Sequence, residues 1–292
     1  MKGKLDYTLT AERFSDFQLA YSHSGRGLYS QKLLLSPVQI VKVAEYLSWN
    51  LMPANAVYSY EFFRDNCSSR IITVLEESLG EEFQTNCVAD GRSFRDGLRP
   101  FIDNSPWTEL GMDFILGPSA DAIMVGCDEA FIPNDLSRAL DLMTISGEPL
   151  TEAGVREDIL LLQAQPVPRK PLPLLLFIGL VAAIIIARLN AGDAAVVTRI
   201  LRGVVLIGAT LLGVLLLLMW SFTDHTDTWA NLNLVWTIPA FFALLSKRFV
   251  IPEAIIIGAF LLLSPFIGLQ FVSVTLWVVV LCVFLTLTPK LK

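Results

Sequence analysis

The sequence predicts an α+β domain exported from the cytoplasm, followed by an all-α polytopic membrane domain of about five helices. Hydrophobic residues make up 53% of the 292 residues and charged residues only 17%, which is more apolar than an ordinary globular chain. The apolar excess lies behind residue 165. We therefore expect two domains, residues 1–165 and residues 172–289.

Charge divides the chain at the same place. The part before Pro166 holds 13 basic and 24 acidic residues, whereas the part from Pro166 onward holds nine basic and four acidic residues. The front domain, with a net charge of −11, lacks the clustered Lys and Arg that bind nucleic acid. Nucleic acid is therefore excluded as a partner.

Five apolar runs approach the roughly 17 to 25 residues that cross a bilayer as a helix. They are residues 172–189, 195–222, 234–245, 252–268 and 271–288. The third run is short, although Trp229 and Trp236 near its start are typical of an interfacial end.

Basic residues that flank these runs predict the orientation, because Lys and Arg are retained on the cytoplasmic side. With the front domain outside, seven basic residues lie at inner ends and two at outer ends. The inner ones are Arg188, Arg199, Arg202, Lys247, Arg248, Lys290 and Lys292, and the outer ones are Arg169 and Lys170. We expect a multi-pass inner (cytoplasmic) membrane protein whose front domain and 223–233 loop lie on the periplasmic side.

An exported amino terminus requires a signal sequence or a preceding span. The start MKGKLDYTLTAERF contains no apolar run that could form the core of a signal sequence or a membrane span. We therefore expect an upstream segment, which would make the front domain amino-terminally incomplete in this sequence.

Two helices are expected in the front domain. One is SPVQIVKVAEYLSWNL, with Ser36 as the N-cap and Pro37 in the first turn. The other follows Asn66 and ends on Gly80, and the segment VYSYEFFRDN between them is typical of an extended strand. Cys67 would then lie at a helix start, where free N–H groups stabilise a thiolate and bind an oxyanion.

Several alternatives remain open from the residues alone. Cys67 could equally be a small buried hydrophobe, the commonest fate of a single cysteine. We interpret Cys87, Cys127 and Cys282 as structural, and no spacing rule decides whether Cys87 and Cys127 form a disulfide. His23, the one histidine of the front domain, is typical of a solvated loop.

Without a C-x-x-C pair or a histidine cluster, we expect no metal and no organic cofactor.

Particular motifs carry a resemblance to a known family. The segments GRGLYSQKLLLSPVQ, YSYEFFRDNCSSRI and LGPSADAIMVGCDEAFIPNDL resemble the exported domain of the Lnb-type lipoprotein N-acyltransferases described from Bacteroidetes. The segment SFTDHTDTWANLNLVWTIPAFFAL is similar to the outer loop and following span of that family. The resemblance covers nearly the whole chain, and Asp-Asn-Cys-Ser-x-Arg is its most specific part.

The resemblance implies a set of site residues. Cys67 would be the catalytic nucleophile, supported by Asp65, Asn66 and Arg70. The family also has a Gly-His motif upstream of this cysteine, like the His/Cys pairing of papain-like and NlpC-like enzymes, and this sequence begins after that point. The fold implied is therefore a partial papain-like/NlpC-like domain.

The outer loop would supply the rest of the site. His225 is expected to be catalytic, with Asn231 and Asn233 as supporting residues, because polar groups near membrane depth tend to mark substrate sites. The alternative interpretation is an ordinary polar loop.

The expected function is acyl transfer to the α-amine of a lipoprotein's lipidated cysteine through a thioester on Cys67. The partners would be lipoproteins and phospholipid in the membrane. One alternative is a membrane-anchored NlpC-like cysteine peptidase or amidase, which would need a single span. The other is a non-catalytic membrane scaffold in which Cys67 is part of the core.

Overall fold

The computed structural model describes residues 6–161, 171–190, 195–267 and 270–288. They form two compact units. The α/β unit contains the described residues up to Gly97 together with residues 123–161, and the helical unit contains Leu98–Ala122 together with the described residues from 171 onward. The expected division at residue 165 lies outside the described residues, as do Arg169, Lys170, Gly268, Lys290 and Lys292.

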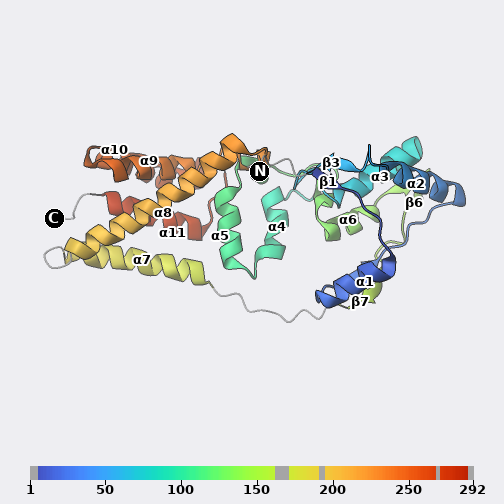
Figure 1. The fold of residues 1–292 in the computed structure, drawn as a ribbon, viewed down its shortest axis with the longest axis horizontal. Helices are drawn as coiled ribbons and strands as arrows, with labels where there is room; N and C mark the ends of the chain where they lie inside the picture. Colours follow the sequence, from blue (N-terminus) through green and yellow to red (C-terminus); the bar gives the residue numbers. More distant parts are fainter. Residues whose placement is uncertain (1–5, 162–170, 191–194, 268–269, 289–292) are drawn as a thin grey trace. The chain divides into compact units, whose positions relative to one another are not determined.

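The α/β unit combines short helices with small antiparallel sheets (Figure 1). Its helices are α1 (Phe14–His23), α2 (Pro37–Asn50), α3 (Ser69–Leu79), η1 (Gly80–Glu82), η3 (Asp128–Phe131) and α6 (Pro133–Leu140), and α4 (Phe94–Ile102) begins in it. Its strands pair as β1 (Asp6–Thr8) with β3 (Val57–Ser59), β2 (Leu28–Ser30) with β7 (Glu157–Leu160), and β4 (Phe83–Gln84) with β5 (Thr144–Ile145) and β6 (Glu148–Pro149). A mixed α/β part before the apolar helices is thereby confirmed.

Local sequence signals explain where the two predicted helices begin and end. Ser36 and Gln39 form a reciprocal capping box at the start of α2. Gly80 has φ +60° at the end of α3, a left-handed value that glycine adopts without strain. The expected strand is shorter than its alternating pattern, because the chain turns between Glu61 and Asp65, whose backbones exchange two hydrogen bonds of 3.0 Å.

Two apolar clusters hold the α/β unit together. The larger one joins α3 to α6 and to the strand β5. Its members include Ile72, Leu75, Leu79, Phe83, Leu136, Leu140, Met143, Ile145 and Leu150. The smaller one contains Phe63, Phe94 and Phe131, whose ring centroids lie 5.0 to 5.6 Å apart and which are all buried.

The helical unit contains α5 (Pro106–Ile115), η2 (Pro118–Asp121), α7 (Leu172–Leu189), α8 (Ala195–Phe222), η4 (Thr226–Thr228), α9 (Leu234–Leu245), η5 (Lys247–Phe249), α10 (Val250–Ile267) and α11 (Val274–Leu287). The helix α8 packs on α9, α11 packs on α7, and α10 contacts both α9 and α11 (Figure 1). Their contact surfaces are apolar, with Trp236, Ile257 and Val280 completely buried.

Length and apolar composition qualify two of these helices, α7 and α8, as able to cross a membrane. The other three apolar helices, α9 to α11, do not meet this criterion within the described residues. The expected apolar runs are therefore helical, but five crossings are not confirmed and stay a prediction.

Residues 98–122 pack with the apolar helices, although the sequence places them inside the front domain. Asn231 donates to the last two carbonyls of α5 and Gln270 to the carbonyl of the next residue, Leu116, while the Gly117 N–H donates to the Asp227 carbonyl at 2.7 Å. The Asp121 carboxylate accepts from the Phe271 N–H at 2.9 Å. Residues 98–122 thus belong to the helical unit by their packing, and the domain boundaries expected from the sequence stay a prediction.

Candidate functional site

Cys67 lies at the beginning of α3 with an exposed side chain and a free thiol. The carbonyl of Asn66 accepts a backbone hydrogen bond from the Arg70 N–H at 3.1 Å, so Cys67 lies in the turn that leads into α3, two residues before Ser69. The helix start expected from the sequence is thus present. The alternative of a buried core cysteine does not fit the exposure of this side chain.

The side chain of Asn66 determines this geometry. Its Oδ1 accepts hydrogen bonds from the N–H groups of Ser68 and Ser69 at 2.8 and 3.0 Å. Its Nδ2 donates to the carbonyls of Phe62 and Phe131 at 3.0 and 2.8 Å. Asn66 is buried. Its hydrogen bond to the Phe131 carbonyl joins the turn before Cys67 to the cluster of Phe63, Phe94 and Phe131.

Among the described residues, the N–H of Cys67 itself has no hydrogen-bond partner. The next two N–H groups of the helix are bound by Asn66. The donor available to an oxyanion at this helix end is therefore the backbone N–H of the cysteine, next to its own sulfur.

Asp65 and Arg70 form an ion pair beside the cysteine. Arg70 Nη2 donates a hydrogen bond of 2.8 Å to Asp65 Oδ2, and Arg70 Nε lies 2.8 Å from Asp65 Oδ1, so the two charges are closely paired. The guanidinium carbon also lies 3.7 Å from the ring centroid of Tyr58. Asp65, Asn66 and Arg70 thus all lie close to Cys67, while their contribution to catalysis stays a prediction.

Tyr7, Tyr58 and Tyr60 form a cluster of aromatic rings near Cys67, called the tyrosine wall below. The sequence analysis did not identify this cluster. Tyr7 stacks on Tyr60 with ring centroids 4.2 Å apart, and it lies 6.1 Å from the ring of Tyr58. Burial, together with the nearby charge of Cys67, raises the pKa of Tyr60 to about 12 and also raises the pKa of Tyr58. Both phenols therefore keep their protons at neutral pH and can act as hydrogen-bond donors but not as bases.

The remaining three cysteines have the structural roles expected of them. Cys87 and Cys127 form a disulfide, which the spacing left open, and Cys282 is buried in the helical unit. Cys67 is thus the exposed free thiol of the four.

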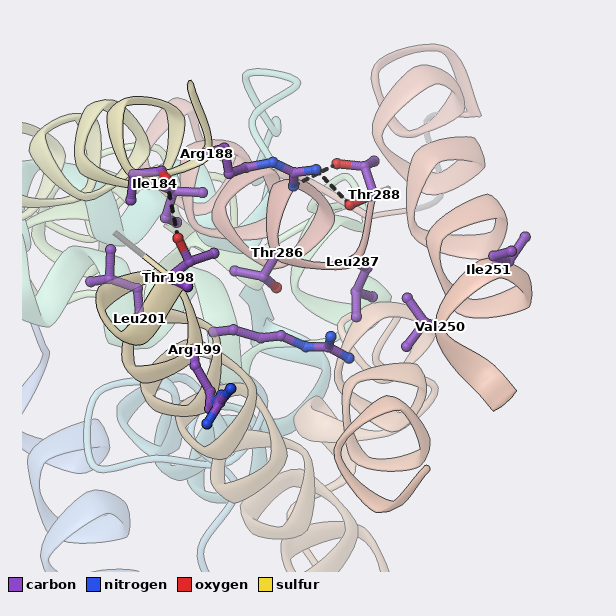
Figure 2. A pocket seen from close by; sticks show the side chains of 13 residues that line it. Ile184, Arg188, Thr198, Arg199, Leu201, Val250, Ile251, Thr286, Leu287 and Thr288 are labelled. Atoms are coloured by element: carbon purple, nitrogen blue, oxygen red, sulfur yellow. Dashed lines mark hydrogen bonds between the residues drawn. The ribbon is translucent and has the colours of Figure 1, made fainter. Parts of the chain in front are cut away.

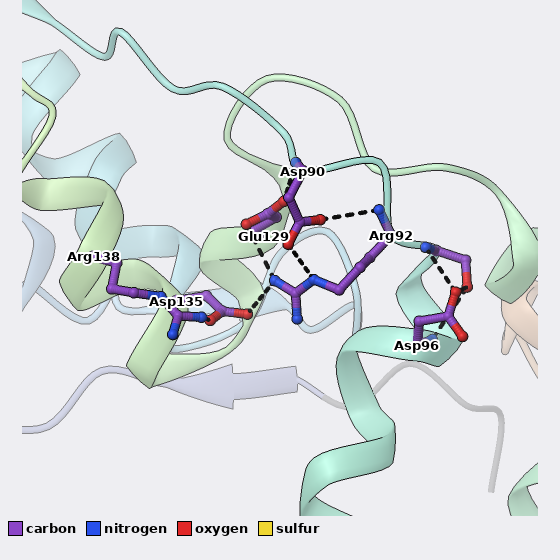
Figure 3. Close-up of polar contacts among 7 residues, drawn as sticks. Asp90, Arg92, Asp96, Glu129, Asp135 and Arg138 are labelled. Carbon is purple, nitrogen blue, oxygen red and sulfur yellow. Dashed lines mark hydrogen bonds and ion pairs between the residues drawn. The ribbon is translucent and has the colours of Figure 1, made fainter.

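An arginine-centred network, drawn in Figure 3, lies close in sequence to both cysteines of the disulfide. Arg92 pairs with Asp90, with Glu129 at 3.3 Å and with Asp135 at 3.2 Å, and Arg138 also pairs with Asp135. Bonds from the N–H and the guanidinium of Arg92 hold the pKa of Asp90 below its usual value. These carboxylates are neutralised by arginine, which is typical of a structural network and not of a general acid.

Asn231 and Asn233 are both buried in the helical unit. Asn231 Nδ2 donates to the carbonyls of Phe114 and Ile115, and Asn233 Nδ2 donates to that of Phe114, over 2.8 to 2.9 Å. The oxygen of Asn233 accepts from Trp236 Nε1 at 2.9 Å. Both amides therefore satisfy the carboxyl end of α5, and a further part in the site stays a prediction.

His225 has an exposed side chain just before η4, and among the described residues its ring has no hydrogen-bond partner. It belongs to the helical unit, whereas Cys67 belongs to the α/β unit. The expected pairing of the two residues is thus untested. His23, at the end of α1, is exposed in the α/β unit, as expected of a solvated histidine.

The fold and this site define a class of membrane protein with a cysteine-bearing periplasmic domain at its amino terminus. Residues 1–97 match the family model described as the Lnb N-terminal periplasmic domain. The match confirms the resemblance to the Lnb family and includes Asp65, Asn66, Cys67 and Arg70. No curated protein and no solved structure matches the chain.

Proposed function

We propose that the protein is a lipoprotein N-acyltransferase that works through a thioester on Cys67. The acyl donor is the ester of a phospholipid or of the lipoprotein's own diacylglyceryl group, and the acceptor is the α-amine of the lipidated cysteine. The observation that supports this proposal best is the exposed, free thiol in the turn that leads into α3, within the segment that matches the Lnb periplasmic-domain family.

The first step forms the acyl-enzyme. The Cys67 thiolate attacks the ester carbonyl, a C–S bond forms, and the C–O bond breaks to release an alkoxide, which takes up a proton to become the alcohol. The free N–H of Cys67 and the protonated hydroxyls of Tyr58 and Tyr60 are the donors that would stabilise the negative charge on the carbonyl oxygen.

The second step transfers the acyl group. The neutral α-amine attacks the thioester, a C–N bond forms, the C–S bond breaks, and the amine loses a proton as the thiolate returns. A base is needed for this proton and for activation of the thiol. We assign that role to His225, with the 223–233 loop and the Cys67 domain on the same face of the membrane.

Serine substitution in the full-length protein tests the proposal. Cys67→Ser should abolish conversion of diacylated lipoproteins to N-acylated ones, because a hydroxyl is far less ionised than a thiol near neutral pH. Cys282→Ser is the matched control, since it changes the other free cysteine, which lies in the helical unit. His225→Ala should impair transfer and His23→Ala should not.

The readout is mass spectrometry of lipoprotein amino-terminal peptides, with membrane abundance measured in parallel. Undiminished N-acylation by the Cys67→Ser variant would exclude the acyl-enzyme mechanism. If instead lipoproteins were unaffected and cell-wall peptides accumulated uncleaved, the peptidase alternative would take its place.

A further inference from the structure

A pocket lies in the helical unit between the last turns of α7 and α11 and the first turns of α8 and α10 (Figure 2). Its volume is about 410 Å³, within the range of roughly 300 to 1,000 Å³ that small-molecule sites occupy. It is separate from Cys67 and from the 223–233 loop. Apolar side chains, among them Ile184, Leu201 and Leu287, form part of its wall.

The charged residues of the lining are all arginines. They are Arg188, Arg199 and Arg202, and no Asp or Glu lines the pocket within the described part of the chain. Guanidinium ions at the edge of an apolar pocket, with no acidic side chain among the described lining residues, favour binding of an anion.

Arg188 has a structural role in this pocket. Its guanidinium donates to the carbonyls of Leu285 and Thr288 and to the Thr288 hydroxyl, the last at 2.9 Å. It thereby satisfies the carboxyl end of α11, where a positive charge is favourable (Figure 2). Its charge contributes to the pocket while its side chain is held in place.

Arg199 and Arg202 are the available donors. They lie three residues apart, on one face of α8, and neither has an ion pair or hydrogen bond among the residues that the structure describes. The hydroxyls of Thr198 and Thr286 donate to the carbonyls of Ala187 and Val283 instead. A ligand in this pocket would therefore be bound by the guanidinium N–H donors of two arginines and would contact apolar side chains.

We propose that this pocket binds a phosphate-bearing anion through Arg199 and Arg202. Arginine recognises phosphate by paired N–H donors, and basic pockets between membrane helices bind anionic headgroups. The apolar wall favours a phospholipid headgroup with its glycerol and first acyl carbons over a free phosphate. This site is distinct from the proposed acyl-transfer site.

The test uses the full chain purified in detergent micelles and three probes: short-chain phosphatidylglycerol, short-chain phosphatidylcholine and inorganic phosphate alone. Binding is followed by the shift in thermal unfolding temperature. The variant is Arg199→Gln with Arg202→Gln, and each single variant is also measured. The matched control is Arg248→Gln, which removes an exposed arginine outside the pocket.

Phosphatidylglycerol should bind the native chain and Arg248→Gln equally, and bind the double variant at least about tenfold more weakly, since charge-assisted bonds are lost. Phosphatidylcholine, whose headgroup has no net charge, should bind weakly to all. Stabilisation by inorganic phosphate alone that the double variant loses would identify a soluble phosphate as the ligand. The proposal fails if neither phosphatidylglycerol nor inorganic phosphate binds, if the double variant binds as the native chain does, or if Arg248→Gln weakens binding as much as the double variant.

Discussion

At the scale of single residues, Asn66 determines where α3 begins and therefore where the Cys67 thiol lies. Its amide makes four hydrogen bonds, two to N–H groups of the helix and two to carbonyls of the neighbouring segments. These bonds join the helix start to both segments through one buried side chain. Asn66 thus positions the turn that carries Cys67.

Asn66→Ala should destabilise the α/β unit by about 2 to 4 kcal/mol, because a helix cap is lost and two carbonyls lose their donors. Thermal or denaturant unfolding measures the change. Asn104→Ala, at an exposed residue whose side chain makes no hydrogen bond among the described residues, should change stability by less than about 0.5 kcal/mol. Equal stability of the two variants would contradict the capping role.

Asp141 gives the α/β unit a predictable response to acid. Burial alone would raise its pKa, but hydrogen bonds from Arg156, Thr151 and the Gly154 N–H outweigh burial and lower the pKa. A carboxylate with a lowered folded-state pKa stabilises the fold above its unfolded pKa, and this stability is lost as the pH falls through the folded-state pKa. The loss is therefore expected below about pH 4.

Asp141→Asn should reduce stability at neutral pH and make unfolding less dependent on pH in this acid range. Denaturant melts at a series of pH values provide the measurement. A variant whose stability still fell with acid as steeply as that of the native chain would show that Asp141 is not responsible.

At the scale of elements, the segment from α5 to η2 contacts the 223–233 loop so closely that no space is left for a side chain at Gly117. A Cβ built on Gly117 would lie 2.2 Å from the Trp229 carbonyl oxygen, whereas a Cβ on Gly111 would meet nothing within 4 Å. Glycine at position 117 is therefore required by close approach of two chain segments.

Gly117→Ala should displace this segment from the 223–233 loop and lower the unfolding temperature and membrane abundance. Gly111→Ala is the matched control, and it should be neutral or slightly stabilising, because alanine favours a helix over glycine by about 1 kcal/mol. The account of this contact is wrong if both variants are equally abundant and equally stable.

The sequence predicted the elements better than their packing. Capping signals at Ser36 and Gly80 and the apolar runs indicated helices close to the observed bounds, since such signals are local. The attachment of residues 98–122 to the apolar helices depends on contacts between residues more than 100 positions apart, such as Asn231 with Phe114. No local pattern reports such contacts.

The candidate site was predicted in the same uneven way. The position of Cys67 at a helix start followed from Asn66 and the apolar pattern behind it. The tyrosine wall did not, because β1 brings Tyr7 to Tyr58 through strand pairing, and the alternation in VYSYEFF indicated only a strand. The disulfide was likewise undecided, since it joins residues 40 positions apart.

At the scale of the whole molecule, the disulfide and the distribution of basic residues each indicate on which side of the membrane a part of the chain lies. A disulfide between Cys87 and Cys127 is typical of an oxidising compartment, which agrees with a periplasmic domain. The excess of arginine and lysine at one set of helix ends predicts that this set faces the cytoplasm.

Reporter fusions test this orientation. Alkaline phosphatase inserted at Thr226 should be active, because it would lie in the periplasm, and phosphatase fused after residue 292 should be inactive. Activity at the carboxyl terminus, or inactivity at Thr226, would place the 223–233 loop and the Cys67 domain on opposite faces of the membrane. His225 could then not serve Cys67.

The central claim is that Cys67 carries the acyl group, and the most direct measurement is the mass of the peptide that contains it. The full-length protein is incubated with phospholipid vesicles without lipoprotein, digested, and analysed before and after neutral hydroxylamine. The account predicts a Cys67 peptide heavier by one fatty acyl group, sensitive to hydroxylamine, absent from Cys67→Ala and lost when lipoprotein is added. An unmodified Cys67 peptide in a preparation that still N-acylates lipoproteins would contradict it.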